Sequence, residues 1–467
     1  MDQKYKLLIK NVSYLAIGNF ASKLLVFLLV PLYTNVLSTE EYGNYDAITT
    51  TVALLTPLLI ANISDGVMRF LLDNKNNEKE IMSIGFKFVS IGIMIIGVLL
   101  LVNRHFQFVY FLDGYELLTF VYAAFHILNS HITQCAKGLN KVSIIAKAGF
   151  LSTFVMIAAN ILFLLVFHYG IMGFFLANII GLISPTIYYC IKIHPFKYLS
   201  IRSVDNQLQK EMLVYSMPLI FNTIGWTINS SLDKYCVIYF YGIAVSGVLA
   251  VAYKIPTILS VIYSMFTQAW QISAVAEYEN KDRENFYSST FLFTNGLGSL
   301  CCACLLLGNK TLSRFLFAKE FYHAWQYVPF LLISVLFNQT AGFIGPLLSA
   351  KRESNAMAKA AIIGALANFL CNIIFIKIFG IQGATIATAV SSFVIYYVRW
   401  LYAKDLLKKR IYPQLYSSWV LIIISAFAEI YNIGYLIQIM SLIGILIINR
   451  KEYHKVFNLI PIKRENE

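Results

Sequence analysis

Charged residues are scarce in this sequence. Only 13% of its 467 residues are Asp, Glu, Lys or Arg, whereas 58% are hydrophobic and the mean hydropathy is +0.67. A soluble domain carries about a quarter charged residues. The polar helix faces that a large soluble helical core would need are also missing. The composition therefore argues against a soluble protein and favours a polytopic membrane protein.

Two kinds of chemical site are also missing. The seven cysteines all lie in apolar segments, and the stretch "CCAC" at 301–304 has no His or acidic neighbour. Small buried hydrophobic residues are the better interpretation, so we expect no metal site and no structural disulfide. No G-x-x-x-x-G-K-[ST] stretch occurs, so the chain has no P-loop of its own. We expect no catalytic residues.

What the sequence does contain is a series of apolar runs of lipid-spanning length. They predict an all-α membrane protein of about fourteen transmembrane helices. The predicted segments are 12–37, 44–66, 84–102, 116–136, 144–167, 171–191, 214–241, 247–272, 286–307, 324–348, 358–378, 381–402, 415–431 and 433–449.

Positive charge is distributed unevenly between the predicted loops. The net charge is +13, but the basic residues sit in short loops and form no continuous patch, which argues against nucleic-acid binding. If the N-terminus is cytoplasmic, the cytoplasmic side holds about 29 of the 37 Lys and Arg residues. We therefore predict that both termini are cytoplasmic and that the start of the chain is an uncleaved first helix.

An internal duplication predicts two related lobes. Residues 146–173 align with residues 358–383, and the shared motifs include Ala-Lys-Ala, Asn-Ile and Gly-Ile-x-Gly. Six helices separate the copies, so both enter the membrane in the same direction. This favours two six-helix lobes related by a pseudo-two-fold axis along the membrane normal, with the substrate path between them. The predicted divisions are an N-terminal lobe at 1–210, a C-terminal lobe at 211–412, and two appended helices with a basic tail at 413–467.

Ionisable residues lie inside several predicted spans. Lys23, Asp233, Lys234 and Lys254 belong to the opening helices of the two lobes. A charge at a helix centre costs about 2.5–3.5 kcal/mol, and such residues usually face a bundle interior or a water-filled cavity. We expect them to line a cavity with excess positive charge. The alternative is that each lysine pairs with an acid or a carbonyl and locks helices together.

Other polar residues in the spans are candidates for a gate or for substrate contacts. Asp65 and Arg69 share a helix face and could form a gate or a helix-end pair. Asp46 is expected at a helix interface. Amides and aromatic rings suit sugars, which offer hydroxyl groups and apolar ring faces. The amide and aromatic residues on the charged helices are Asn222, Trp226, Asn229, Tyr253, Gln268, Trp270 and Gln271, and they are the candidate glycan contacts.

Several stretches together resemble a known family. "SKLLVFLLVPLYTNVLSTEEYGNYD", "MPLIFNTIGWTINSSLDKYCVIYF" and "GVLAVAYKIPTIL" are similar to the O-antigen type flippases for polysaccharide repeat units, which belong to the multidrug/oligosaccharidyl-lipid/polysaccharide exporter superfamily. The resemblance covers nearly the whole chain and implies two lobes in a V shape around a cationic cavity. It assigns pyrophosphate binding to Lys23, Lys234 and Lys254, with Asp233 as a partner. The family often has Arg where Lys234 stands, so the bidentate fork is lost there.

The resemblance also implies an activity and a location. The substrate would be an undecaprenyl-pyrophosphate-linked oligosaccharide, moved by alternating access to the outer leaflet of a bacterial cytoplasmic membrane for surface polysaccharide synthesis. A polysaccharide polymerase and a chain-length regulator are possible partners, and the chain is expected to be a monomer. No cofactor is implied, although a proton gradient, a sodium gradient or the membrane potential could drive transport. The open alternatives are a lipid II flippase, a cation-coupled multidrug exporter and a membrane scaffold for glycosyltransferases.

Overall fold

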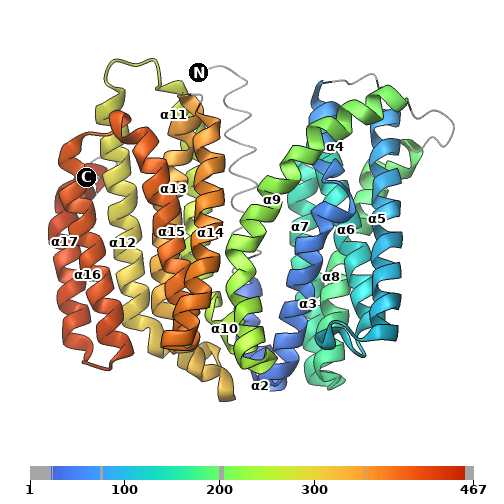
Figure 1. Cartoon of the computed structure of the whole chain (residues 1–467), viewed down its shortest axis with the longest axis horizontal. Coiled ribbons are helices and arrows are strands. Elements are labelled where there is room, and N and C mark those ends of the chain that lie inside the picture. Colours follow the sequence, from blue (N-terminus) through green and yellow to red (C-terminus); the bar gives the residue numbers. More distant parts are fainter. Residues whose placement is uncertain (1–22, 24, 74–76, 199–204, 352, 458–467) are drawn as a thin grey trace, which may run out of the picture. The chain divides into compact units, whose positions relative to one another are not determined.

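The computed structural model describes residues 23, 25–73, 77–198, 205–351 and 353–457. Within these ranges the chain forms helices and turns and contains no strand (Figure 1). Contacts divide it into two compact units. Unit 1 comprises Met1–Ala250 and Leu316–Phe321, and unit 2 comprises Val251–Phe315 and Tyr322–Glu467.

Within the described residues, unit 1 contains eight α-helices and most of a ninth, which follow one another along the chain. Their bounds are α2 (Val30–Val36), α3 (Thr39–Leu59), α4 (Ile63–Asp73), α5 (Glu78–Phe106), α6 (Glu116–Gly138), α7 (Val142–Asn160), α8 (Gly170–Ile193), α9 (Asn206–Tyr241) and α10 (Ile243–Ala252). Short helices are η2 (Tyr110–Leu112), η3 (Ile161–Val166) and η4 (Pro195–Tyr198).

Unit 2 is built from the remaining seven long helices. Their bounds are α11 (Lys254–Ala276), α12 (Arg283–Leu316), α13 (Val328–Ala350), α14 (Ser354–Phe379), α15 (Ile381–Ala403), α16 (Tyr412–Ile430) and α17 (Tyr435–Phe457). Short helices are η5 (Lys319–Gln326), η6 (Lys404–Leu406) and η7 (Lys409–Ile411).

The predicted spans correspond to these helices. In the described residues, 8 helices are long and apolar enough to cross a membrane, and the number rises to 10 when each of two bent pairs counts as one span. The predicted segments 116–136, 214–241 and 433–449 match the less apolar helices α6, α9 and α17. The first predicted segment, 12–37, falls largely outside the described residues, and its end is α2.

One predicted span is broken in the middle. Helices α3 and α4 were expected as a single helix, but they meet at an angle of 55°. The backbone at the break adopts left-handed conformations at Ala61 (φ 49°) and Asn62 (φ 48°). Asn tolerates this region, and its side chain here donates to Asp65 Oδ2 at 2.9 Å, which stabilises the start of α4. The second bent pair, α10 and α11, meets at 40° next to Tyr253.

The duplicated segments share local structure. Gly170 and Gly380 both have positive φ angles, of 54° and 65°, at the start of the second helix of each copy. A Cβ on Gly173 would lie 3.2 Å from the carbonyl oxygen of Phe163, and one on Gly383 would lie 2.0 Å from that of Phe375. In both copies the backbones therefore approach closely at the aligned position. The aligned residues Asn160 and Asn372 are both fully buried, and each donates to the carbonyl four residues earlier at 2.9 Å.

The compact units do not divide at the predicted lobe boundary between residues 210 and 211. By packing, the division falls after Ala250, because α9 and most of α10 lie against α3 and α4. Gly247 is one reason, since a Cβ there would lie 2.1 Å from the carbonyl oxygen of Thr39. The lobes that the repeat suggests remain a prediction from the sequence.

A short segment after α12 also packs in unit 1. The Thr34 hydroxyl donates to the Leu316 carbonyl at 3.1 Å and accepts from the Ala318 amide at 3.3 Å. Thr39 donates to Glu320 Oε2 at 3.2 Å. The residues that precede and follow this segment belong to unit 2, so the chain leaves unit 2 and returns to it here.

Candidate functional site

The three predicted phosphate-binding lysines are divided between the two units. Lys23 is helical and exposed, and it belongs to unit 1 together with Lys234 of α9. Lys254 is the first residue of α11, is half-buried, and belongs to unit 2.

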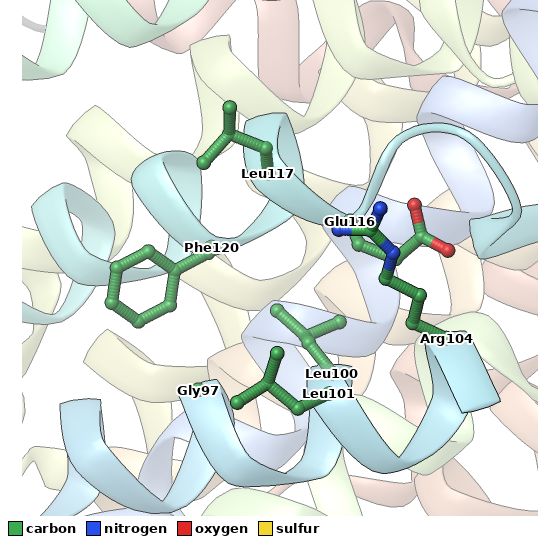
Figure 2. A pocket seen from close by; sticks show the side chains of 7 residues that line it. All are labelled: Gly97, Leu100, Leu101, Arg104, Glu116, Leu117 and Phe120. Carbon is green, nitrogen blue, oxygen red and sulfur yellow. The ribbon is translucent and has the colours of Figure 1, made fainter.

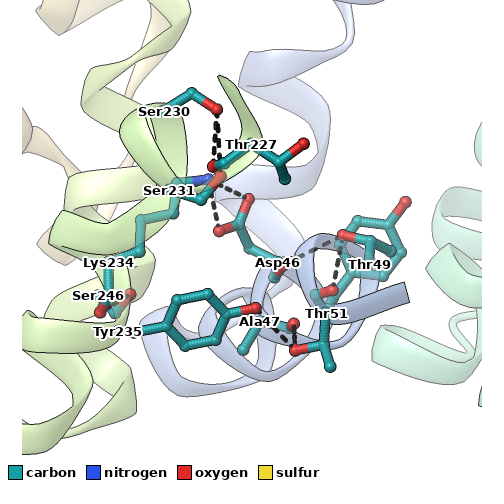
Figure 3. A network of polar contacts seen from close by, with 11 residues as sticks. Asp46, Ala47, Thr49, Thr51, Thr227, Ser230, Ser231, Lys234, Tyr235 and Ser246 are labelled. Atoms are coloured by element: carbon teal, nitrogen blue, oxygen red, sulfur yellow. Dashed lines mark hydrogen bonds and ion pairs between the residues drawn. The ribbon is translucent and has the colours of Figure 1, made fainter. Parts of the chain in front are cut away.

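Lys234 makes an ion pair that the sequence analysis did not identify. Its Nζ lies 2.8 Å and 3.0 Å from the two carboxylate oxygens of Asp46 on α3. Both side chains are only 16% exposed. Figure 3 shows the surrounding polar network, in which the hydroxyls of Thr51 and Tyr235 are 2.9 Å apart. The network joins α3 to α9.

The pair changes the charge expected at this position. Asp46 was expected at a helix interface, and it is the acid that neutralises Lys234. Asp233, the predicted cavity partner, is 1% exposed, consistent with its pointing about 100° away from Lys234 around the helix. The expected excess of positive charge is therefore reduced here. A phosphate that binds Lys234 would share its ammonium group with Asp46 or displace that carboxylate.

Asp65 and Arg69 do not make the pair that their spacing suggested. Asp65 accepts hydrogen bonds from Asn62 and from Gln134 of α6. Arg69 instead pairs with Asp73 at 3.2 Å, and both of these side chains are about half exposed. The break between α3 and α4 is the cause, because it brings the Asn62 amide to Asp65. In place of a pair with each other, Asp65 accepts hydrogen bonds at the start of α4, and Arg69 forms a separate ion pair at the surface.

Most of the predicted glycan contacts cannot be placed by their side chains. The backbones of Asn222, Trp226 and Asn229 lie in α9 and that of Gln268 lies in α11, but their side chains fall outside the described part of the structure. Tyr253 is half-buried at the bend between α10 and α11.

Trp270 is placed clearly, and it is a packing residue. Its side chain is 3% exposed, and its Nε1 donates to the Phe343 carbonyl at 2.8 Å. Its ring stacks on that of Phe343 with 4.2 Å between centroids. A glycan contact by Trp270 stays a prediction from the sequence, and in the structure this face of α11 is buried against α13.

Helix α11 also carries a polar stripe, of which the sequence analysis selected only Gln271. A cleft of about 370 Å³ in unit 2 lies between α11 and α13. Ser260, Ser264, Thr267 and Gln271 line it from α11, and their spacing of four, three and four residues puts them on one helix face. Asn338 and Gln339 line it from α13, and the remaining lining residues are Tyr263, Val335 and Gly342. None of these lining residues is charged.

The cleft leaves hydrogen-bonding capacity for a ligand. Ser264 and Thr267 donate to carbonyls of their own helix at 2.8 Å and 3.0 Å, so their oxygens keep acceptor capacity. Gln339 is 9% exposed, and neither its amide oxygen nor its amide nitrogen has a partner within the described residues. Asn338 donates to Ser392 at 2.9 Å, while its oxygen has no partner there. A buried polar atom left unpaired costs about 1–3 kcal/mol, so this set suits a polar ligand or water.

The polar stripe could have been found from the sequence. Ser, Thr and Gln recur at helical spacing in an apolar segment, whereas lipid-facing positions are apolar. In the described ranges, no group of three or more His, Cys, Asp or Glu residues could hold a metal ion.

The fold and these apolar spans define a multi-pass helical membrane protein. Its structure is similar to that of the lipid II flippase MurJ in an inward closed conformation, with a TM-score of 0.69 and 15% identity over 95% of this chain and 99% of that one. It is also similar to an inward-facing multidrug resistance MATE transporter of the MOP superfamily, with a TM-score of 0.66 and 14% identity over 85% and 94%. At this identity the likeness shows the fold, which is MATE-like as predicted.

The family follows from the sequence comparison. The model of the polysaccharide biosynthesis protein family matches residues 8–271, which is more than half of the chain. The chain belongs to this family, and the resemblance noted in its motifs is confirmed. An uncharacterized membrane protein of Methanocaldococcus jannaschii is 24% identical over 285 residues. That match covers 56% of this chain and 54% of the relative, so it spans about half of its length.

A third structural relative has a notable binding pocket. It is a MOP superfamily transporter from Pyrococcus furiosus, with a TM-score of 0.61 and 14% identity over 85% of this chain and 95% of that one. Its description states that reversed polarity of the binding pocket suggests a different function.

Proposed function

We propose that this protein is a flippase for a lipid-linked oligosaccharide. It moves an undecaprenyl-pyrophosphate-linked repeat unit from the inner to the outer leaflet of a bacterial cytoplasmic membrane by alternating access, for assembly of a surface polysaccharide. Membership of the polysaccharide biosynthesis family supports the substrate class. The family and the structural relatives are transporters and flippases, and the proposal describes transport without a chemical reaction.

The observation that carries the proposal is the uncharged polar cleft of unit 2. Its hydroxyl and amide groups lie on two helices of membrane-spanning length, where only apolar side chains would be needed for contact with lipid. Amides both donate and accept hydrogen bonds, as sugar hydroxyls do. Gln339 and Asn338 together offer unpaired donor and acceptor atoms. A glycan passing through unit 2 would satisfy them, whereas a cationic drug would find no acidic group in the cleft.

The pyrophosphate requires positive charge elsewhere. Lys23 is exposed on its helix, Lys254 is half-buried, and Lys234 forms an ion pair with Asp46. Phosphate binding by these three lysines stays part of the proposal, and Lys23 is the one whose side chain is exposed. An inside-negative potential favours outward movement of an anion by about 2.3 kcal/mol per charge per 100 mV. Return of an empty cationic site to the inner side is favoured by the same field, so the membrane potential could drive the cycle, and a proton or sodium gradient stays an alternative driving force in the proposal.

Deletion of the gene tests the function. We expect the lipid-linked repeat unit to accumulate on the inner leaflet and surface polymer to be lost. Hypersensitivity to cationic drugs without this accumulation would instead support the multidrug exporter. Growth arrest through cell-wall failure would support lipid II transport, and loss of sugar assembly on the lipid would support a scaffold.

A reconstituted assay tests the cleft. Proteoliposomes carrying a fluorescent lipid-linked oligosaccharide should expose it to an external glycosidase only when the protein is present. Gln339→Leu should slow this exposure, and Trp270→Phe, which alters packing on the other face of α11, should not affect substrate affinity. Equal transport by wild type and Gln339→Leu would contradict a glycan path through the cleft.

A further inference from the structure

Unit 1 contains a groove with mostly apolar walls. It lies in unit 1 between α5 and α6 and has a volume of about 250 Å³. Figure 2 shows its walls, formed by Leu100 and Leu101 of α5 and by Leu117 and Phe120 of α6. Leu101 is 67% exposed and Leu117 is 75% exposed. Because α5 is a membrane-spanning helix, these side chains meet the hydrocarbon chains of lipids.

Gly97 opens the deep part of the groove. A Cβ at this position would lie 3.1 Å from the Phe120 ring, so the aromatic ring approaches the α5 backbone at a point where a side chain is missing. Any larger residue at Gly97 would fill the space that the glycine leaves. Gly97 lies seven residues before Arg104, which corresponds to about 10 Å along the helix.

At the end of the groove opposite Gly97, exposed aromatic residues mark the level of the membrane surface. Phe106, Phe108 and Tyr110 follow directly after the groove and are 60%, 76% and 55% exposed. Aromatic side chains collect where hydrocarbon gives way to lipid headgroups. The groove therefore extends from the headgroup level to about 10 Å below it.

Two opposite charges stand at the headgroup end. Arg104 is in the last turn of α5 and Glu116 is the first residue of α6, and both line the groove. Figure 2 places both side chains at the end away from Phe120. A guanidinium binds a phosphate through paired hydrogen bonds, and a carboxylate accepts hydrogen bonds from an ammonium group.

We propose that this groove binds one aminophospholipid with a phosphatidylethanolamine headgroup. Its acyl chain lies along Leu101, Leu117 and Gly97, its phosphate contacts Arg104, and its primary ammonium contacts Glu116. The charge arrangement favours this headgroup, since its ammonium makes a charge-assisted hydrogen bond to the Glu116 carboxylate, whereas the glycerol of an anionic phosphatidylglycerol offers only uncharged hydroxyl donors. The groove is separate from the proposed transport path and does not depend on what the protein transports.

Native mass spectrometry of the full-length protein tests the proposal. The purified protein is titrated with phosphatidylethanolamine and, separately, with phosphatidylglycerol of the same acyl chains. The wild type should retain phosphatidylethanolamine more strongly. Arg104→Ala should weaken binding of both lipids by about fivefold, the effect of one basic residue at a headgroup. Glu116→Gln should remove the preference between the two lipids while leaving the protein able to bind phosphatidylglycerol.

A larger side chain at Gly97 tests whether the acyl chain binds in the groove. Gly97→Leu should reduce retained lipid by about tenfold, because it displaces about two methylene groups from the groove. Val98→Leu is the matched control, since Val98 is a 60% exposed neighbour that does not line the groove. Elution as a single species checks that each variant is folded, and the two charge variants test the headgroup site even if Gly97→Leu fails to fold.

Three results would overturn the proposal. One is equal retention of the two phospholipids by the wild type, and another is an unchanged preference in Glu116→Gln. The third is equal lipid retention by Gly97→Leu and Val98→Leu. Preferential retention of a polyprenyl phosphate over phosphatidylethanolamine would identify a different occupant and would likewise contradict the assignment.

Discussion

Removing the ion pair between Asp46 and Lys234 should reveal whether the pair stabilises the fold or whether Lys234 is needed to bind a substrate. At 2.8 Å and an effective dielectric constant of about 20, the Coulomb attraction of the pair is about 6 kcal/mol. Loss of hydration offsets much of this, because both side chains are only 16% exposed. Contacting charges usually show interaction energies of about 0.5–3 kcal/mol, and we expect about 2 kcal/mol here.

A double-mutant cycle measures that energy. The variants are Asp46→Asn, Lys234→Gln and the two combined, and the free energy of unfolding is measured by denaturant titration in detergent micelles. Each single variant should be destabilised, because it leaves one charge without its partner. The combined variant should be more stable than the sum of the two single effects predicts, by about 2 kcal/mol.

The pair between Arg69 and Asp73 is the matched control. It is also formed by two opposite charges, at 3.2 Å, but its side chains are 52% and 51% exposed. An exposed pair of this spacing on a helix contributes about 0.3–0.5 kcal/mol. The same cycle at these positions should therefore give a much smaller interaction energy.

Transport by the combined variant separates the two roles of Lys234. If the pair joins α3 to α9, the combined neutral variant should fold and keep substantial flippase activity. Purely additive single effects on stability would refute the argument. So would a stable combined variant that transports nothing, since Lys234 would then be needed for the substrate itself.

Three further predictions concern single positions. Lys23→Ala should abolish polymer display with the protein still present in the membrane, while Lys23→Arg should keep part of it; equal polymer display by the two variants would make Lys23 a packing residue. Gln339→Leu should lower transport without lowering stability, because it removes a buried amide that has no partner within the described residues; a clear drop in the thermal midpoint would contradict this. Gly383→Ala should destabilise the protein by at least about 1–3 kcal/mol, since its Cβ would overlap the Phe375 carbonyl. Gly225→Ala is the control for the last change, because a Cβ there meets nothing within 4 Å.

The closest agreement between sequence and structure concerns the helices and the repeat. Apolar length alone locates the spans, because a bilayer requires long runs without charge and helices that pair their own backbone groups. The Gly-Ile-x-Gly motif predicted a shared feature, and Gly173 and Gly383 both lie at close backbone contacts.

The spacing of residues along a helix was less reliable for predicting which side chains bond to one another. Asp65 and Arg69 are four residues apart on a helix, yet each bonds elsewhere, because the backbone breaks at Ala61 and Asn62. The sequence contains no proline or glycine at the break itself, and the local signal is Asn62, a residue type that tolerates the left-handed conformation. Trp270 is another example, since its hydrogen bond to Phe343 joins residues 73 positions apart.

The amino-acid sequence by itself determined the class of protein, the approximate number and length of its helices and the family to which it belongs. These properties depend on local composition and on the thickness of the bilayer. Only the tertiary structure decided that Lys234 is neutralised by Asp46, that Trp270 is buried, and that Gln339 faces a polar cleft. Each of these depends on which face one helix presents to another that is distant in the chain, and spacing within a single helix carries no information about that.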